Sequence, residues 1–213
     1  SREKYIEGLN HLIDSWSKCR YMRGQKKSFR LIATLDQYEL KINKHEIKDI
    51  LVDPFMERYS SKEFSIELEN LIKKYPEIDD WQIVGHSMGG SVVMFTNQSF
   101  PYNDKITFNT VATPVYYERE KTPFFVRMYE SIFNKRCSET INSLDNEFDN
   151  GFTNKHVQWR NLKAFDSQFK KYDFDPYDRI IKDSIVFQFP DSLDGERVGH
   201  TSSLYFSVLE IIN

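Results

Sequence analysis

A cluster of glycines between two apolar segments constrains the fold of this 213-residue chain more than any other feature. Three of its eight glycines fall within the sequence GHSMGG at residues 85–90. The segment before the cluster, 81–84, is typical of a buried strand, and residues 91–97 after it are typical of a helix. Glycine permits close backbone approaches that side chains forbid. The pattern therefore predicts a sharp turn from a strand directly into a helix, with Ser87 at its apex.

The order of the other segments predicts an α/β fold. Apolar runs typical of strands lie at 29–35, 50–52, 81–84, 106–111, 157–165 and 184–189. Apolar residues at helical spacing mark helices at 5–16, 61–72, 91–97 and 202–212. Strands that alternate with helices are typical of parallel pairing. We therefore expect a mostly parallel central sheet flanked by helices.

The length and composition fit one globular domain. Hydrophobic residues make up 39% of the chain and charged residues 29%, which is the balance of a folded protein. We expect a single domain over 1–213, with a cap-like helical insertion over 116–150 that is polar apart from an aromatic stretch at 124–133. The net charge of −3 argues against nucleic acid as a partner.

The sequence also sets expectations for the protein's location. No apolar run approaches the roughly 20 residues of a membrane span, so we expect no transmembrane segment. Two cysteines, Cys19 and Cys137, do not make a disulfide framework, which favours a reduced, cytoplasmic protein.

Residues 83–90, IVGHSMGG, resemble the nucleophile elbow of lipases and esterases in the α/β-hydrolase superfamily. In that G-x-S-x-G turn, small residues two positions before and after the serine let the strand and helix pass closely. The resemblance implies an α/β-hydrolase fold and a Ser–acid–His triad in that chain order, with Ser87 as the nucleophile. The Met88 N–H, at the start of the helix, is expected to face the developing oxyanion.

A serine nucleophile needs a base, and histidine is the usual one. Among the five histidines, His200 stands in a loop-like stretch before the closing helix, where the superfamily has its catalytic histidine. His156 is the alternative. The other histidines precede the nucleophile strand or adjoin the serine, and we expect surface or packing roles for them: His11, His45 and His86.

Asp166 is the predicted acid. It ends the stretch WRNLKAFD at 159–166, which resembles a superfamily segment in which a Trp-x-Asn strand ends in the triad aspartate. It also lies between Ser87 and His200 in the chain. Three aspartates stay open as alternatives: Asp183, Asp191 and Asp194. The first of these stands in a sequence that resembles the Asp-x-Val segment of fungal-type lipases.

Two further parts of the site are a second oxyanion donor and an acyl pocket. The superfamily supplies a second oxyanion donor from the loop after an early strand, often with a His-Gly sequence. Here the residues that follow 29–35 are Asp-Gln-Tyr, without a glycine, and we expect the donor to be the N–H of Leu35, with that of Asp36 as the alternative. In the aromatic stretch, Phe124, Phe125 and Met128 are expected to line an acyl pocket.

These features predict a serine hydrolase of lipid metabolism. It would cleave a carboxylic ester, lipid-like or with another apolar acyl group, through an acyl-enzyme on Ser87. We expect no cofactor or metal, because the sequence has no metal-ligand spacing, phosphate-binding loop or dinucleotide fingerprint. The expected partner is a small-molecule or lipid ester, which allows transient contact with a membrane surface. The alternatives are a thioesterase or amidase with the same triad, and a hydrolase-fold binding module without turnover.

Overall fold

A computed structural model of the chain describes residues 29–34, 51–52, 61–76, 78–122, 141, 143–193 and 195–212. Several expectations fall outside these residues: the helix at 5–16, the histidines His11 and His45, the cysteines Cys19 and Cys137, Leu35, Asp194, and the pocket residues Phe124, Phe125 and Met128.

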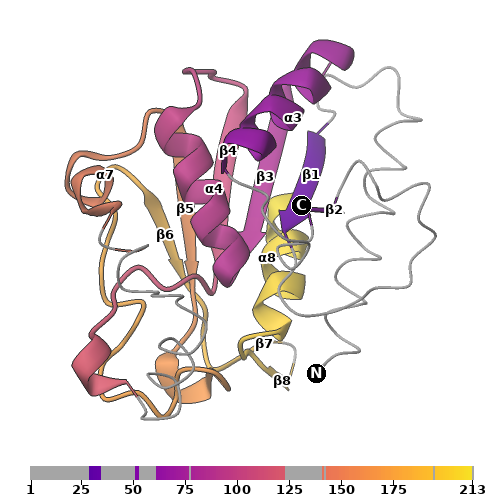
Figure 1. Ribbon diagram of the computed structural model, residues 1–213. Coiled ribbons are helices and arrows are strands. Elements are labelled where there is room, and N and C mark those ends of the chain that lie inside the picture. The colour runs from indigo at the N-terminus through magenta and orange to yellow at the C-terminus, as the bar shows by residue number, and fades with distance from the viewer. Residues whose placement is uncertain are drawn as a thin grey trace.

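The described part is built on a six-stranded sheet in the order β2-β1-β3-β4-β5-β6 (Figure 1). Its strands are β1 (Phe29–Thr34), β2 (Leu51–Val52), β3 (Asp80–His86), β4 (Ile106–Val111), β5 (Lys155–Arg160) and β6 (Ile185–Gln188). Every neighbouring pair is parallel. The prediction of a parallel α/β sheet is therefore confirmed.

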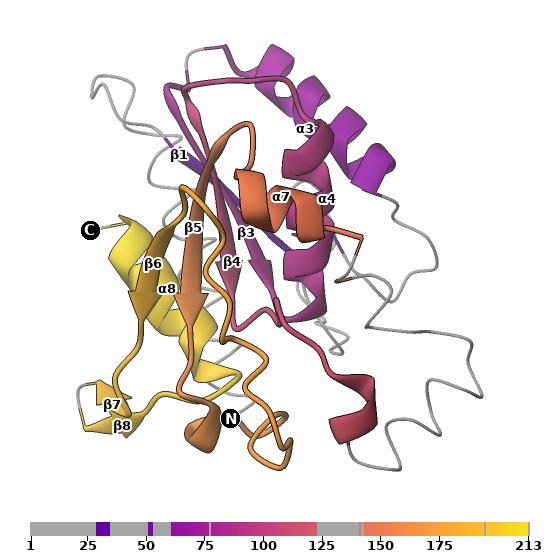
Figure 2. The same ribbon diagram turned by 90° about the vertical axis from the view of Figure 1, so that its left-hand side faces the viewer.

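Helices cover both faces of the sheet, as a parallel sheet requires. The helices are α3 (Ser61–Lys74), α4 (Met88–Ser99), α7 (Asp145–Asn150) and α8 (Ser202–Ile212), with short 3₁₀ turns η1 (Arg119–Lys121) and η2 (Lys163–Phe165). Figure 2 shows α3 and α4 on one side of the sheet and α8 on the other. None of the helices in the described ranges has the length and apolar content needed to cross a bilayer.

The helical spacing of apolar side chains explains how α3 and α8 pack against the sheet. Phe64 and Leu68, one turn apart on α3, are fully buried in a cluster with Trp81 of β3. Leu204 and Val208 have the same spacing on α8 and are buried in a second cluster. The two helices therefore hold the sheet between two apolar layers.

The end of β5 differs from the prediction. The strand expected over 157–165 stops at Arg160, and the chain turns through η2 before it reaches Asp166. The Phe165 N–H donates to the Leu162 carbonyl at 2.9 Å, which closes a tight turn where a strand would need an extended backbone. The acid predicted at the strand end therefore lies in the loop beyond it.

A small antiparallel hairpin was not predicted. Strands β7 (Ser192–Leu193) and β8 (Glu196–Arg197) pair just before the His200 loop. The turn between them contains Asp-Gly at 194–195, a common hairpin signal, and Gly195 has a φ of 78°.

The carboxyl ends of the central strands meet at one edge of the sheet. Thr34 of β1 lies opposite Gly85 of β3, and Val111 of β4 lies opposite both His86 and Trp159. Figure 2 shows the arrowheads of β3 to β6 pointing the same way. Loops that leave this edge gather around the end of β3, which is where open α/β sheets carry their sites.

Candidate active site

Ser87 occupies a one-residue turn between a strand and a helix. Strand β3 ends at His86 and α4 begins at Met88. Ser87 has φ 56° and ψ −124°, a sparsely populated conformation for a residue with a side chain. The strained turn predicted for Ser87 is confirmed.

The glycines around Ser87 make this turn possible. A Cβ on Gly85 would lie 2.6 Å from the Gly89 carbonyl oxygen, and one on Gly90 would lie 1.8 Å from Thr113 Oγ1. Both distances are too short for any side chain. The Ser87 N–H donates to the Val111 carbonyl at 2.9 Å, which ties the turn to the end of β4.

The structure brings the three predicted triad residues together from separate segments. His200 Nε2 lies 3.0 Å from Ser87 Oγ, and His200 Nδ1 lies 2.8 Å from Asp166 Oδ2. The three side chains are 4% exposed or less, so bulk water does not compete for these contacts. The result is a buried hydrogen-bonded row of serine hydroxyl, imidazole and carboxylate.

The loop that carries His200 is held at its backbone. The Ser203 hydroxyl donates to the His200 carbonyl at 2.8 Å, and Nε2 of His86 lies 2.7 Å from the same oxygen. Burial and the neighbouring His200 lower the pKa of His86 to about 3, so its ring is neutral and donates from Nε2. His86 packs as expected, but its bond to the His200 loop was not foreseen, nor was the part played by Ser203.

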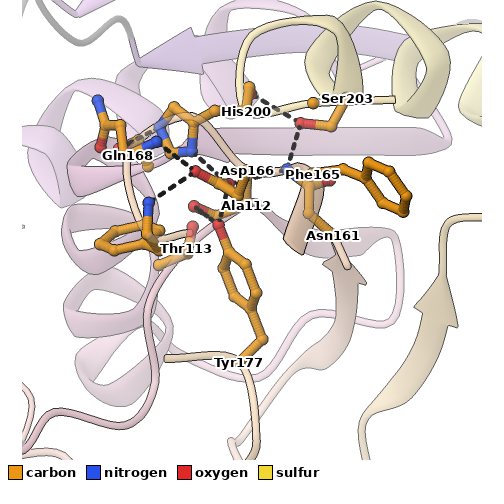
Figure 3. A network of polar contacts seen from close by, with 12 residues as sticks. Ala112, Thr113, Asn161, Phe165, Asp166, Gln168, Tyr177, His200 and Ser203 are labelled. Atoms are coloured by element: carbon orange, nitrogen blue, oxygen red, sulfur yellow. Dashed lines mark hydrogen bonds and ion pairs between the residues drawn. The ribbon is translucent and has the colours of Figure 1, made fainter. Parts of the chain in front are cut away.

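Asp166 is fully buried and accepts hydrogen bonds on both oxygens (Figure 3). Oδ1 accepts from the backbone N–H groups of Gln168 at 2.8 Å and Phe169 at 3.2 Å. Oδ2 accepts from the side chains of His200, Tyr177 and Asn161. These bonds determine both the position and the charge of the carboxylate.

Burial alone would raise the pKa of Asp166. The hydrogen bond and charge of His200, with the hydrogen bonds from Tyr177 and Asn161, outweigh burial and lower this pKa to about 2. Asp166 is therefore an anion throughout the neutral range, and the imidazole keeps its Nδ1 proton directed at that anion.

The structure separates the alternative residues from this row. Asp183 and Asp191 are exposed, and Asp183 precedes β6, at the opposite end of the sheet from the elbow. His156 is buried near the start of β5, where its ring contacts the hydroxyls of Ser184 at 2.8 Å and Thr110 at 3.2 Å. The hydrogen bonds that connect Ser87, His200 and Asp166 include none of these three.

One of the two expected oxyanion donors, the Met88 N–H, lies within the described residues. Met88 is the first residue of α4, so its N–H belongs to the first turn, where backbone donors lack intrahelical acceptors. Strand β1 ends at Thr34, opposite Gly85, so the chain leaves β1 at the same edge as the elbow. Within the described ranges, no three His, Cys, Asp or Glu side chains are grouped as a metal site.

Two buried neutral histidines predict that acid destabilises the fold. Burial lowers the pKa of His156 to about 3, as it does for His86, whereas both titrate near 6.5 when unfolded. As the pH falls below 6.5 the unfolded chain takes up protons that the folded chain does not, so the free energy of unfolding should fall by up to about 3 kcal/mol per pH unit. Asp166 adds to this loss only below its ordinary pKa of 3.8.

Urea unfolding at pH 7, 6 and 5 measures this slope. His156→Gln, which removes one of the two groups, should have a lower overall stability but about half the pH dependence. Equal unfolding free energies at pH 7 and pH 5 would contradict the assignment of two buried neutral rings.

Matches among solved structures include three proteins at low sequence identity to this chain. A monoacylglycerol lipase of Paleococcus ferrophilus is 12% identical over 72% of this chain and 75% of its own, with a TM-score of 0.42. MenH of S. aureus is 13% identical over 89% of this chain and 91% of its own, with a TM-score of 0.46. An esterase of Pyrococcus furiosus is 12% identical over 89% and 80%, with a TM-score of 0.44. The comparison with curated proteins finds no match.

The sequence pattern of the lipase (class 3) family matches residues 20–145. The match spans more than half of the 213 residues and includes the elbow around Ser87, although it ends before Asp166 and His200. The parallel sheet and the strained serine turn agree with the α/β-hydrolase fold expected from residues 83–90. The chain therefore belongs to the lipase (class 3) family of α/β-hydrolases.

Proposed function

We propose that this chain is a serine-dependent carboxylic ester hydrolase that works through an acyl-enzyme on Ser87. The observation that carries the proposal is the buried row in which His200 lies 3.0 Å from Ser87 Oγ and 2.8 Å from Asp166 Oδ2. A hydroxyl becomes a nucleophile when a neighbouring base takes its proton, and that base acts well when a third group fixes its tautomer.

In the proposed acylation, Ser87 Oγ attacks the ester carbonyl carbon while His200 Nε2 takes the hydroxyl proton. The imidazolium then gives this proton to the leaving alcohol as the C–O bond breaks. In deacylation a water molecule replaces the alcohol: His200 takes a proton from water, the hydroxide attacks the acyl carbon, and Ser87 leaves with the proton. Asp166 stays ionised and stabilises the imidazolium in both steps.

The oxyanion of each tetrahedral intermediate needs hydrogen-bond donors. We assign one to the Met88 N–H, because Met88 begins α4, directly after the nucleophile and at the positive end of the helix dipole. The Leu35 N–H is assigned as the second, because β1 ends beside Gly85, two residues before the nucleophile.

The substrate class proposed is a lipid-like ester with an apolar acyl group. Its support is membership of a lipase family and the aromatic sequence at 124–133, where Phe124, Phe125 and Met128 are the proposed pocket residues. We also propose that residues 116–150 form a cap-like insertion in a single domain over 1–213.

A fluorophosphonate probe tests the proposed function directly, because it labels activated serines and not inert ones. The folded chain should be labelled on the peptide that contains Ser87, and heat denaturation should abolish the label. Hydrolysis of p-nitrophenyl esters should accompany labelling, with long acyl chains preferred over acetate. Ser91→Ala, which alters another serine in the first turn of α4, is the matched control and should label like the wild type. A folded chain that is neither labelled nor active on esters, thioesters or amides would be a binding module.

A further inference from the structure

A tyrosine hydroxyl contacts the same carboxylate oxygen that accepts the imidazole proton. Tyr177 is 1% exposed, and its hydroxyl lies 2.5 Å from Asp166 Oδ2 (Figure 3). Burial and the charge of Asp166 raise the pKa of Tyr177 well above 10, so the phenol stays protonated and donates. Oδ2 therefore shares its negative charge among His200 Nδ1, the Asn161 amide and the Tyr177 hydroxyl, of which the hydroxyl makes the shortest contact.

Contacts to the neighbouring backbone, to the ring and to the hydroxyl hold Tyr177 in place. The Pro176 carbonyl accepts the N–H groups of Val115 at 2.8 Å and Tyr116 at 3.0 Å, which fastens the segment to the turn after β4. The Phe169 ring packs edge-on against Tyr177 with centroids 5.8 Å apart, and the Tyr177 hydroxyl lies 3.4 Å from the Ala112 carbonyl. A donor fixed in this way favours a single orientation of the carboxylate.

We propose that Tyr177 is a positioning residue for the triad: its hydroxyl fixes the Asp166 carboxylate with Oδ2 toward His200 and limits the negative charge that this oxygen presents to the imidazole. The inference rests on the proposed function, because it gives Tyr177 a part in the same reaction. It adds a fourth side chain to the row, contributed by the loop between β5 and β6.

The charge that His200 experiences comes from Asp166. The titratable groups in direct contact with the His200 ring are Asp166 from the loop after β5 and His86 from β3, whose ring centroid is 4.9 Å away. Three further charged side chains line the same cavity as His200: Lys170, Glu196 and Arg197. His86 is neutral and the hydrogen bond to Oδ2 is direct, so a change in the charge on Oδ2 acts on the imidazole at the shortest distance. Loss of the Tyr177 hydroxyl concentrates charge on Oδ2, stabilises the imidazolium and makes His200 a stronger base but a less well oriented one.

Tyr177→Phe removes this hydroxyl and nothing else. We expect kcat to fall about tenfold with KM within about twofold of the wild type, as for one charge-assisted hydrogen bond lost from orientation. The acidic limb of the kcat/KM profile should move up by about half a pH unit, because that limb reports the base in the free enzyme. A purely structural role would lower the amount of folded protein without moving the limb.

Tyr116→Phe is the matched control. It removes a hydroxyl that also donates to a carboxylate, that of Glu118, from the segment fastened to Pro176. Its profile should coincide with that of the wild type. Wild-type kcat and an unmoved limb in Tyr177→Phe would overturn the proposal.

A measurement on the imidazole separates this inference from the proposed function. The ring proton of His200 can be followed by NMR titration and assigned by its absence in His200→Gln. Its pKa should rise in Tyr177→Phe. It should fall when Tyr177 is replaced by a tyrosine with fluorine beside the hydroxyl, a stronger donor of nearly the same shape that preserves the fold.

Shifts of one sign in both variants, or no shift in the fluorinated protein, would overturn the role of Tyr177 whether or not esters are cleaved. Absence of probe labelling on Ser87 would instead reject the proposed function, and the titration would still decide whether Tyr177 acts on the Asp166–His200 pair.

Discussion

Ser87→Ala should lower kcat for ester hydrolysis by about 10⁵- to 10⁶-fold and abolish fluorophosphonate labelling. The variant loses the atom that bonds to the acyl carbon, and His200 then has no hydroxyl proton to take. The remaining rate would come from substrate binding and the oxyanion donors acting on water. The measurement is turnover of a p-nitrophenyl ester at saturation, together with mass spectrometry of probe-treated protein.

The fold should survive this substitution. Alanine keeps the Cβ that the strained turn already accommodates, and loss of the hydrogen bond to His200 Nε2 costs about 1 kcal/mol of stability. Urea unfolding of Ser87→Ala should therefore stay close to the wild-type curve. Turnover equal to the wild type in a folded Ser87→Ala protein would place the nucleophile elsewhere and remove the basis of the proposed mechanism.

The elbow was predictable because its demands are local. Gly85 and Gly90 are required by contacts within a few residues or with the neighbouring strand, and such steric requirements are visible in the sequence itself. The alternation of strands and helices likewise identified the parallel sheet. The Ser–acid–His order along the chain then favoured His200 as the predicted base. In the structure His200 lies just before α8.

Contacts across long loops were not predictable in the same way. Tyr177 lies in a stretch without helical or strand periodicity, and its hydroxyl meets Asp166 only because the loop is fastened to the turn after β4. Ser203 and His86 both reach the His200 carbonyl from different elements. No spacing of residues in the sequence predicts such contacts. The strand end at Arg160 was missed for a related reason, because apolar residues continue through η2 after the pairing with β6 has stopped.

Asp166→Asn should lower kcat by about 10⁴-fold while the protein stays folded. An asparagine can keep its carbonyl oxygen at the Oδ1 position, where the Gln168 and Phe169 N–H groups donate. Its NH₂ group would then face His200 Nδ1, which must accept instead of donate. That tautomer places a proton on Nε2, toward Ser87, so the imidazole can no longer take the serine proton.

This variant should still fold, because the groups that donate to Oδ2 in the wild type have other acceptors nearby. The Tyr177 hydroxyl and the Asn161 side-chain NH₂ would both face an NH₂ donor in place of a carboxylate oxygen. The Ala112 carbonyl, 3.4 Å from the hydroxyl, and the Ser203 hydroxyl oxygen, 3.4 Å from the Asn161 nitrogen, offer them other acceptors. Asp183→Asn and Asp191→Asn, which alter exposed aspartates, are the controls and should keep turnover within about twofold of the wild type, as surface substitutions usually do. A large loss in either control, with Asp166→Asn near wild type, would assign the acid to another loop and leave Ser87 and His200 as nucleophile and base. A large loss in Asp166→Asn alone would agree with the burial of Asp166 and with its pKa, which hydrogen bonds from His200, Tyr177 and Asn161 lower to about 2 so that the carboxylate is ionised at neutral pH.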